Sequence, residues 1–241
     1  FLLPAFLPKS HLKNLLVSTL AKPFVILAGI TGTGKSYIAR KFAEAIGAKY
    51  LLVPVRPDWN DPSGLIGYKN AFTEEWVSTP FLEFILAAHA EYEAKKSKKE
   101  IADPYIIILD EMNLARVEYY FSDFLSVLED PERKTEGMGI SKEWIPVEFK
   151  KEEKEKEERE WKKCLLENGK LYKKVGKEYQ EVKEEKDKIE GKFYLEFPER
   201  LPPNLIVIGT VNMDETTYAF SPKVLDRANT IEFVMVDIKE Y

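Results

Sequence analysis

The sequence predicts an α/β fold built on a doubly wound, five-stranded parallel sheet. Five short runs are apolar at nearly every position, as expected for strands buried on both faces of such a sheet: residues 24–28, 50–55, 105–109, 205–208 and 230–234. Helical patterns separate these runs, and the alternation of strands with helices is typical of βαβ units. A glycine-rich turn follows the first run, and ligands of doubly wound sheets bind at the carboxyl ends of the strands.

The intervening helices are predicted from apolar residues that recur on one face. The three patterns cover residues 35–46, 79–92 and 117–128. Their apolar positions are Ile38, Ala39, Phe42, Ala43 and Ile46 in the first, Leu82, Ile85, Leu86 and Ala90 in the second, and Phe121, Phe124, Leu125 and Leu128 in the third.

Residues 131–197 interrupt this alternation and are predicted to form a charged insert. A Lys/Glu-rich stretch with few apolar residues comes first, and a hairpin that turns near Gly176 follows. Residues 144–149 and 192–197 can pair as strands at the base of the insert. The charge favours a solvated helix or partly disordered segment. The alternative interpretation is a docking arm.

Composition limits the class of protein. The 241 residues suit one large α/β domain or two small ones, and the net charge of −5 provides no basic field that would attract nucleic acid or an anionic membrane. The single cysteine, Cys164, excludes an internal disulfide and fits a reducing cytoplasm. No apolar run approaches the roughly 20 residues that span a bilayer. One glutamine beside abundant Lys and Glu is a composition reported for thermophiles.

The turn after the first strand matches the phosphate-binding pattern G-x-x-x-x-G-K-[ST]. Its glycines let backbone N–H groups point at phosphates, and the following helix adds its positive end. We expect Lys35 to reach the β- and γ-phosphates and Ser36 to ligate Mg²⁺. A simple glycine-rich turn is the alternative, and the position between a strand and an amphipathic helix disfavours it. The predicted nucleotide-binding residues are Gly29, Ile30, Thr31, Gly32, Thr33, Gly34, Lys35, Ser36 and Tyr37.

Two acids follow the third strand in "YIIILDEMN". Asp110 would lie near Mg²⁺ and hold its coordinating waters, and Glu111 would polarise an attacking water. A helix-capping acid pair is the alternative. The phosphate-binding turn in the same sheet favours catalysis.

Asn212 leaves the fourth strand, which in a doubly wound order lies between the first and the third. Its amide is therefore expected to contact the γ-phosphate and the attacking water. Pro222 starts a short helix that carries Arg227 away from the phosphates of its own chain, where it could reach a neighbour's γ-phosphate in trans. The alternative for Arg227 is a surface ion pair with Asp226 or Glu232. If Arg227 acts in trans, the site is shared between two copies of the chain, and hydrolysis requires the copies to assemble into a ring.

Four segments together resemble the AAA+ module, and more narrowly the McrB family of restriction motors. They are "GITGTGKS", "RPDWNDPSGLIGY", "IILDEMN" and "GTVNMDETTYAFSPKVLDRA". The last resembles the signature Met-Asn-x-x-Asp-Arg, with Asn212 at the asparagine. It departs from the signature at three positions, because Val211, Glu215 and Thr216 replace Met, Asp and Arg. These departures place more weight on Arg227.

Resemblance to McrB implies a hexameric ring, GTP with Mg²⁺, a McrC-like nuclease subunit, and a separate DNA-reading domain. The DNA cut by such systems contains methylated cytosine. GTP is implied by the resemblance alone, because no Asn-Lys-x-Asp motif occurs, and ATP is the alternative. We expect residues 1–22 to pack near the base, residues 23–130 and 198–241 to form the AAA+ core, and a C-terminal helical lid to be absent or truncated. The chain is expected to be an excised part of a longer protein.

The segment "VRPDWNDPSGLIGYKN" (55–70) could line a pore or meet a partner through Trp59 and Tyr68, or could be a rigid loop capped by Trp59. A related "DPxxLIG" pattern occurs in MoxR- and dynein-type AAA+ proteins, which supports an ATP-driven protein-remodelling enzyme as the alternative function. His11 and His89 have no partner at metal spacing, so zinc is not expected. Arg116 could touch a neighbouring subunit, although a surface arginine at a helix start is the simpler interpretation.

Overall fold

A computed structural model describes residues 9–128, 134–135, 138, 140, 143–149, 156–182, 191–213 and 218–233. The chain divides into two compact units. The first contains Phe1–Asn60, Ile106–Tyr119 and Ile206–Tyr241, and the second contains Asp61–Tyr105 and Tyr120–Leu205. No helix in the described ranges is both long enough and apolar enough to cross a membrane.

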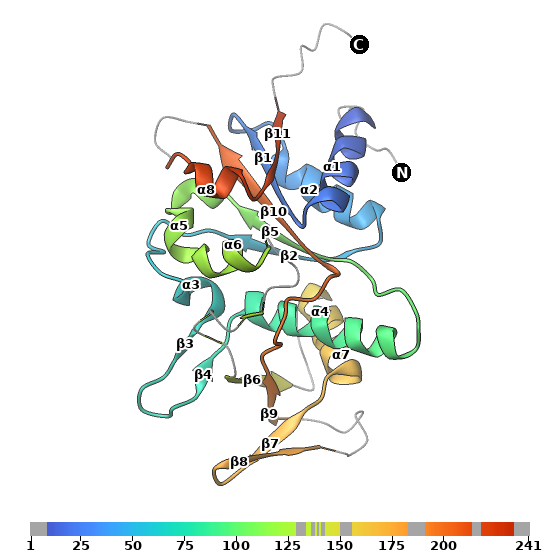
Figure 1. Cartoon of the computed structure of the whole chain (residues 1–241), viewed down its shortest axis with the longest axis vertical. Helices are drawn as coiled ribbons and strands as arrows, with labels where there is room; N and C mark the ends of the chain where they lie inside the picture. The colour runs from blue at the N-terminus through green and yellow to red at the C-terminus, as the bar shows by residue number, and fades with distance from the viewer. Residues whose placement is uncertain are drawn as a thin grey trace, which may run out of the picture. The chain divides into compact units, whose positions relative to one another are not determined.

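The first unit contains the predicted five-stranded sheet, in the order β11-β1-β10-β5-β2 (Figure 1). The sheet is all parallel, so the predicted fold class is confirmed. Its strands are β1 (Phe24–Gly29), β2 (Lys49–Pro54), β5 (Tyr105–Asp110), β10 (Leu205–Asn212) and β11 (Asn229–Phe233). The fourth predicted strand, β10, lies between the first and the third, as expected. The predicted residue Val234 lies outside the described residues.

The core of this unit lies between the sheet and two helices, α1 (Lys9–Ala21) and α2 (Lys35–Ala45). Leu15 of α1 and the predicted apolar face of α2 pack with Val25, Leu27, Ile106, Ile108 and Ile208. β1 is buried along its whole length, which explains why all its residues are apolar or small. Three short helices follow strand ends: η1 (Met112–Leu114), α5 (Val117–Tyr120) and α8 (Pro222–Leu225).

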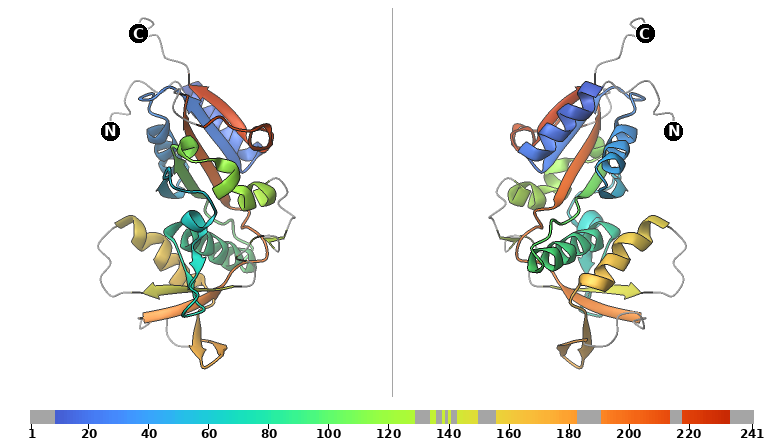
Figure 2. Two further views of the ribbon diagram at one scale, coloured as in Figure 1. Left: turned by 90° about the vertical axis from the view of Figure 1, so that its left-hand side faces the viewer. Right: turned by 90° about the vertical axis from the view of Figure 1, so that its right-hand side faces the viewer.

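The second unit combines helices with two small antiparallel sheets (Figure 2). One is the hairpin of β3 (Tyr68–Lys69) and β4 (Trp76–Val77), after the short helix α3 (Ser63–Ile66). The other has the order β6-β9-β7-β8, with β6 (Trp144–Phe149), β7 (Tyr172–Val175), β8 (Glu178–Glu181) and β9 (Gly191–Glu196). The expected pairing of β6 with β9 and the expected hairpin at Gly176, whose φ is +66°, are both present. The helices are α4 (Pro80–Ser97), α6 (Ser122–Leu128) and α7 (Lys156–Asn168).

The charged stretch of the insert is not a solvated helix, so that expectation was wrong for its described part. α7 packs against α4 and buries Trp161, Cys164 and Leu165. Trp161 lies edge-to-face on Phe84 of α4, with ring centroids 6.3 Å apart. These apolar side chains at positions i, i+3 and i+4 suffice for one buried stripe on a helix whose composition is dominated by charge.

The helix predicted over residues 117–128 is divided into α5 and α6 at Phe121. The buried apolar positions are those expected, including Phe124, which lies edge-to-face on Phe81 at 5.0 Å. The boundary between the two compact units falls at Tyr119 and Tyr120, so the two halves of the predicted helix belong to different units. Periodicity alone cannot reveal such a break.

Glu75, beside β4, joins the β3–β4 hairpin to the four-stranded sheet. Its carboxylate accepts from Lys192 Nζ at 2.5 Å and from the Tyr194 hydroxyl at 2.6 Å, and Lys174 Nζ lies 3.5 Å away. The hydrogen bond from Lys192, and then that from Tyr194, lower the pKa of Glu75 to about 2. The carboxylate is therefore more acidic in the folded than in the unfolded chain.

Glu75→Gln is expected to lower the free energy of unfolding at pH 6 by about 1–3 kcal/mol. Because the folded-state pKa of Glu75 is depressed, the carboxylate contributes fully to the free energy of unfolding above its unfolded-state pKa. This contribution is lost as the pH falls through the folded-state pKa of about 2. Denaturant titrations of both proteins between pH 6 and pH 2 measure the difference, with Glu178→Gln in the β7–β8 hairpin as a control. A difference that stays constant down to pH 2 would contradict the assigned pKa.

Candidate functional site

The site begins where β1 ends and the phosphate-binding loop turns into α2. Gly34 precedes the helix with φ +77°, in the left-handed region that favours glycine. Gly29 permits a close strand approach, because a Cβ at this position would lie 2.6 Å from the carbonyl oxygen of Phe233 in β11. The glycines therefore set both the shape of the loop and its distance from the neighbouring strand.

Lys35 is the buried cation of this loop. Its side chain is almost fully enclosed, and its ammonium donates to the carbonyl oxygens of Gly29 at 3.0 Å and Ile30 at 2.7 Å, and to Thr33 Oγ1 at 3.2 Å. A buried ammonium needs such partners. These contacts hold the positive charge inside the loop, where phosphate oxygens could replace the carbonyls.

The Asp110 carboxylate, at the end of β5, accepts hydrogen bonds from two hydroxyl groups. Ser36 Oγ of α2 donates to Asp110 Oδ1, and Thr210 Oγ1 of β10 donates to the same oxygen at 2.7 Å. The predicted metal residues Ser36 and Asp110 are thus in direct contact. Hydroxyl and carboxylate oxygens are hard donors of the kind that Mg²⁺ prefers beside phosphates, so the donor set fits this ion.

Glu111 has an unusual backbone conformation. Its φ is +52°, which is uncommon for a residue other than glycine and often marks functional sites. Its N–H donates to Thr210 Oγ1 at 3.0 Å, and its carboxylate oxygen Oε1 accepts from Asn212 Nδ2 at 2.9 Å. β10 therefore fixes both the backbone and the carboxylate of Glu111.

Asn212 lies beside the phosphate-binding loop as well as beside Glu111. In the register of the parallel strands it is opposite Gly29, and the next residue, Met213, donates its N–H to the Gly29 carbonyl at 3.2 Å. The side chain of Asn113 fixes its backbone, with Nδ2 donating to the Asn212 carbonyl at 2.7 Å and Oδ1 accepting the Asn212 N–H at 3.3 Å. These contacts hold Asn212 where β1, β5 and β10 end.

Two residues of this network were not predicted from the sequence. Thr210 bridges Asp110 and Glu111, and Asn113 anchors Asn212, and both are almost fully buried. A signal for Thr210 was present, because residues two apart in a strand share a face and Thr210 precedes Asn212 by two. A threonine in a strand is otherwise an ordinary strand-forming residue.

Arg227 is the last of the predicted site residues along the chain. It follows α8, and its guanidinium Nη1 donates to the carbonyl of Lys223 at 3.3 Å. Residues 214–217, which include Glu215 and Thr216, lie outside the described residues. α1 contacts β1 and β11, which places its backbone beside the loop-bearing strand, and the side chain of His11 is not described.

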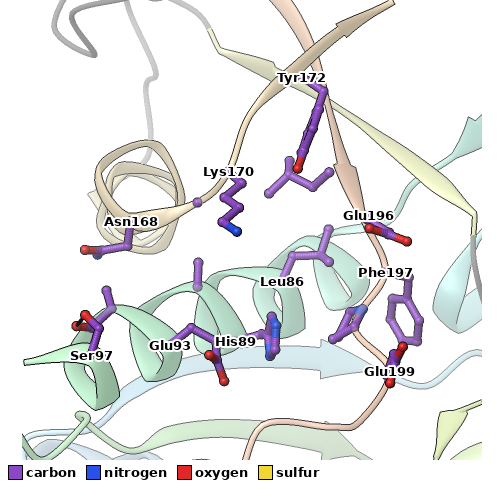
Figure 3. A pocket seen from close by; sticks show the side chains of 15 residues that line it. Leu86, His89, Glu93, Ser97, Asn168, Lys170, Tyr172, Glu196, Phe197 and Glu199 are labelled. Atoms are coloured by element: carbon purple, nitrogen blue, oxygen red, sulfur yellow. Dashed lines mark hydrogen bonds between the residues drawn. The ribbon is translucent and has the colours of Figure 1, made fainter. Parts of the chain in front are cut away.

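The second unit holds a cavity of about 580 Å³ between α4, the end of α7 and the residues after β9 (Figure 3). Burial lowers the pKa of His89, which lies in its wall together with Glu93. Elsewhere in this unit the buried Glu91 carboxylate accepts from the Tyr105 hydroxyl at 2.7 Å and lies 3.2 Å from Cys164 Sγ. Among the described residues no group of three or more His, Cys, Asp or Glu could hold a metal ion.

The site is that of a P-loop NTPase. It combines a phosphate-binding loop that holds the buried Lys35, an aspartate bonded to the serine that follows this lysine, and a glutamate next to the aspartate. The family comparison narrows this class. Residues 24–143 match the family model described as AAA domain (dynein-related subfamily), and this match supports an NTP-hydrolysing AAA+ motor. Nucleotide and Mg²⁺ binding follow in general terms from that family. No curated protein matches the chain.

Proposed function

We propose that the chain hydrolyses a nucleoside triphosphate at the carboxyl ends of β1, β5 and β10. The observation that carries this proposal is the chain of hydrogen bonds from Ser36 through Asp110 and Thr210 to Glu111 and Asn212, beside the loop that holds Lys35. Mg²⁺, held through Ser36 and Asp110, would neutralise phosphate charge when bound. Catalysis then consists of positioning and charge neutralisation.

Each residue has a role that its chemistry supports. Lys35 binds phosphate oxygens through its ammonium, and Glu111 accepts a proton from, or polarises, the attacking water. The Asn212 amide has two N–H donors. One donates to Glu111 Oε1, and we assign the other to the γ-phosphate or the water when nucleotide is bound. Asn212 thus couples the position of the Glu111 carboxylate to the presence of a triphosphate.

Arg227 is proposed to complete the site of an adjoining copy. It lies directly after α8, and its guanidinium donates to the Lys223 carbonyl. A guanidinium in trans stabilises charge on the transferred phosphoryl group only when copies assemble. The proposed assembly is a hexameric ring, in which every site needs two copies.

We further propose that this motor belongs to a methylation-dependent DNA restriction complex of the McrB type, with GTP as substrate and a McrC-like nuclease as partner. DNA would be read by a separate domain. Support comes from the resemblance of the four sequence segments at the phosphate-binding loop, the stretch before β3 that contains α3, the end of β5, and β10 to α8. The site residues themselves do not distinguish guanine from adenine.

The second candidate is an ATP-driven protein-remodelling enzyme of the MoxR or dynein type. The dynein-related description of the matched family and the "DPSGLIG" segment favour it. Both candidates use the same residues for hydrolysis and differ in the nucleotide base and in the substrate that is moved.

The two candidates are separated by incubating the full-length protein and its genomic neighbour with methylated or unmethylated DNA, in the presence of GTP or ATP. The restriction proposal predicts cleavage of methylated DNA with GTP, and no cleavage by a Lys35→Ala variant. Hydrolysis of ATP alone, without cleavage of either DNA, would reject the restriction motor and favour the remodelling enzyme.

A further inference from the structure

The guanidinium of Arg116 is held between two tyrosine rings on the surface of the first unit. Its Cζ lies 5.5 Å from the ring centroid of Tyr119 and 5.3 Å from that of Tyr218, and Nη1 donates to the Tyr119 hydroxyl at 3.1 Å. Arg116 is nevertheless exposed. The two rings and the Tyr119 hydroxyl orient the guanidinium in advance, and because a guanidinium has five N–H donors, others can bind a further acceptor.

A cavity of about 690 Å³ adjoins this guanidinium, and its mostly apolar wall carries two cations. Its walls include Arg116, Ser221 and the exposed Lys223. The Ser221 hydroxyl oxygen is buried and has no hydrogen-bond partner among the described residues. The carboxylate of Glu118, also in the wall, already accepts the Ser221 N–H at 3.0 Å. Two cations in an otherwise apolar wall favour an oxyanion as ligand.

Arg116 belongs to the same hydrogen-bonded block as Arg227. The Tyr218 N–H donates to the Asn113 carbonyl at 3.1 Å, which ties the segment before α8 to the residues that precede Arg116. Glu118 ties α5 to the start of α8, and at the end of α8 the Arg227 N–H donates to the Val224 carbonyl at 3.2 Å. A surface that brings Arg227 to another copy of the chain therefore also carries Arg116.

We propose that Arg116 is a second arginine supplied in trans, which binds an oxyanion of an adjoining copy of this chain. The inference rests on the shared site proposed above. The oxyanion is either a phosphate of the nucleotide held by that copy or a carboxylate of the copy itself. Tyr119 and Tyr218 are positioning residues, since they act by orienting the guanidinium.

The test compares Arg116→Ala, Arg116→Lys and Tyr218→Leu with the wild-type full chain. Nucleotide affinity at high dilution, where copies are separate, should be unchanged in all three. The kcat of the assembled protein should fall roughly 10-fold or more in Arg116→Ala, and Arg116→Lys should recover little of it, because an ammonium neither stacks nor binds in bidentate fashion. Tyr218→Leu keeps the charge and should give an intermediate kcat. Arg40→Ala, on α2, is the matched control.

Sedimentation velocity distinguishes the two sources of the oxyanion. If Arg116 binds a carboxylate, Arg116→Ala should weaken assembly about 10-fold with a diphosphate as well as with a non-hydrolysable triphosphate. If it binds a phosphate, weaker assembly should appear with the triphosphate alone.

Arg227→Ala, measured in parallel, separates this inference from the proposed function. Wild-type kcat and assembly in Arg116→Ala, beside an inactive Arg227→Ala, would overturn the inference and leave the shared site intact. Wild-type kcat in Arg227→Ala would overturn the shared site and this inference together. An Arg116→Ala variant that loses only DNA affinity would assign the surface to nucleic acid and also overturn the inference.

Discussion

Replacement of Glu111 with glutamine is expected to leave a protein that binds its nucleotide and scarcely hydrolyses it. Glutamine keeps the length of the side chain, and its carbonyl oxygen can still accept the hydrogen bond from Asn212 Nδ2. The left-handed backbone at residue 111 is set by contacts of the main chain, including the N–H bond to Thr210, which the substitution does not touch. Only the basic carboxylate is removed.

The expected loss is at least about 100-fold in the turnover rate, which is the contribution typical of a positioned general base. The measurements are phosphate release at saturating nucleotide and the dissociation constant for a fluorescent triphosphate, with Mg²⁺ present. The dissociation constant should change by no more than a few-fold, which shows that the variant is folded. Glu44→Gln on α2 serves as the control for loss of a surface carboxylate. Phosphate release at the wild-type rate in Glu111→Gln would refute the assignment.

Arg227→Ala is expected to be inactive by itself and to become partly active when it is mixed with Lys35→Ala. The two variants lack different halves of a shared site. Arg227→Ala keeps the loop that binds nucleotide. Lys35→Ala loses the buried ammonium that the loop carbonyls enclose, but it keeps the guanidinium of Arg227. A trans arginine contributes about 10³-fold or more to the rate, so each variant alone should be close to silent.

In a random equimolar mixture about a quarter of the sites would combine an intact loop with a neighbour's intact arginine. Phosphate release is measured over a range of mixing ratios, and activity should be greatest near equal amounts. The control replaces Arg227→Ala with Arg200→Ala, which lies in the second unit and should be active without mixing. Absence of rescue at every ratio, with mixed assemblies verified by sedimentation, would remove the trans role.

The sequence was most informative where one physical signal determined the structure. β1 is apolar throughout because both its faces are buried, and the doubly wound order that follows from such strands correctly placed β10 between β1 and β5. That order brought Asn212 opposite Gly29, at the phosphate-binding loop. The contact between Ser36 and Asp110 follows from the same geometry, since both lie at the carboxyl edge of one sheet.

The features that could not be predicted depend on contacts between residues far apart in the chain. Trp161 is buried although its neighbours are charged, because α4 supplies an apolar surface 70 or more residues earlier in the sequence. The bridge made by Thr210 requires the side chain of Asp110 and the main-chain N–H of Glu111 to face β10, and Glu111 has a positive φ at this point. Local propensity carries no information on either arrangement.

The most direct test of the account is an experimental structure of the assembled protein with Mg²⁺ and a non-hydrolysable triphosphate. The account predicts that Lys35 Nζ leaves the carbonyls of Gly29 and Ile30 for phosphate oxygens, with Ser36 at the metal and the Asn212 amide facing the γ-phosphate. Arg227 should approach the γ-phosphate bound by an adjoining copy. A triphosphate bound elsewhere in the chain, with Lys35 still on its own loop carbonyls, would contradict the central claim.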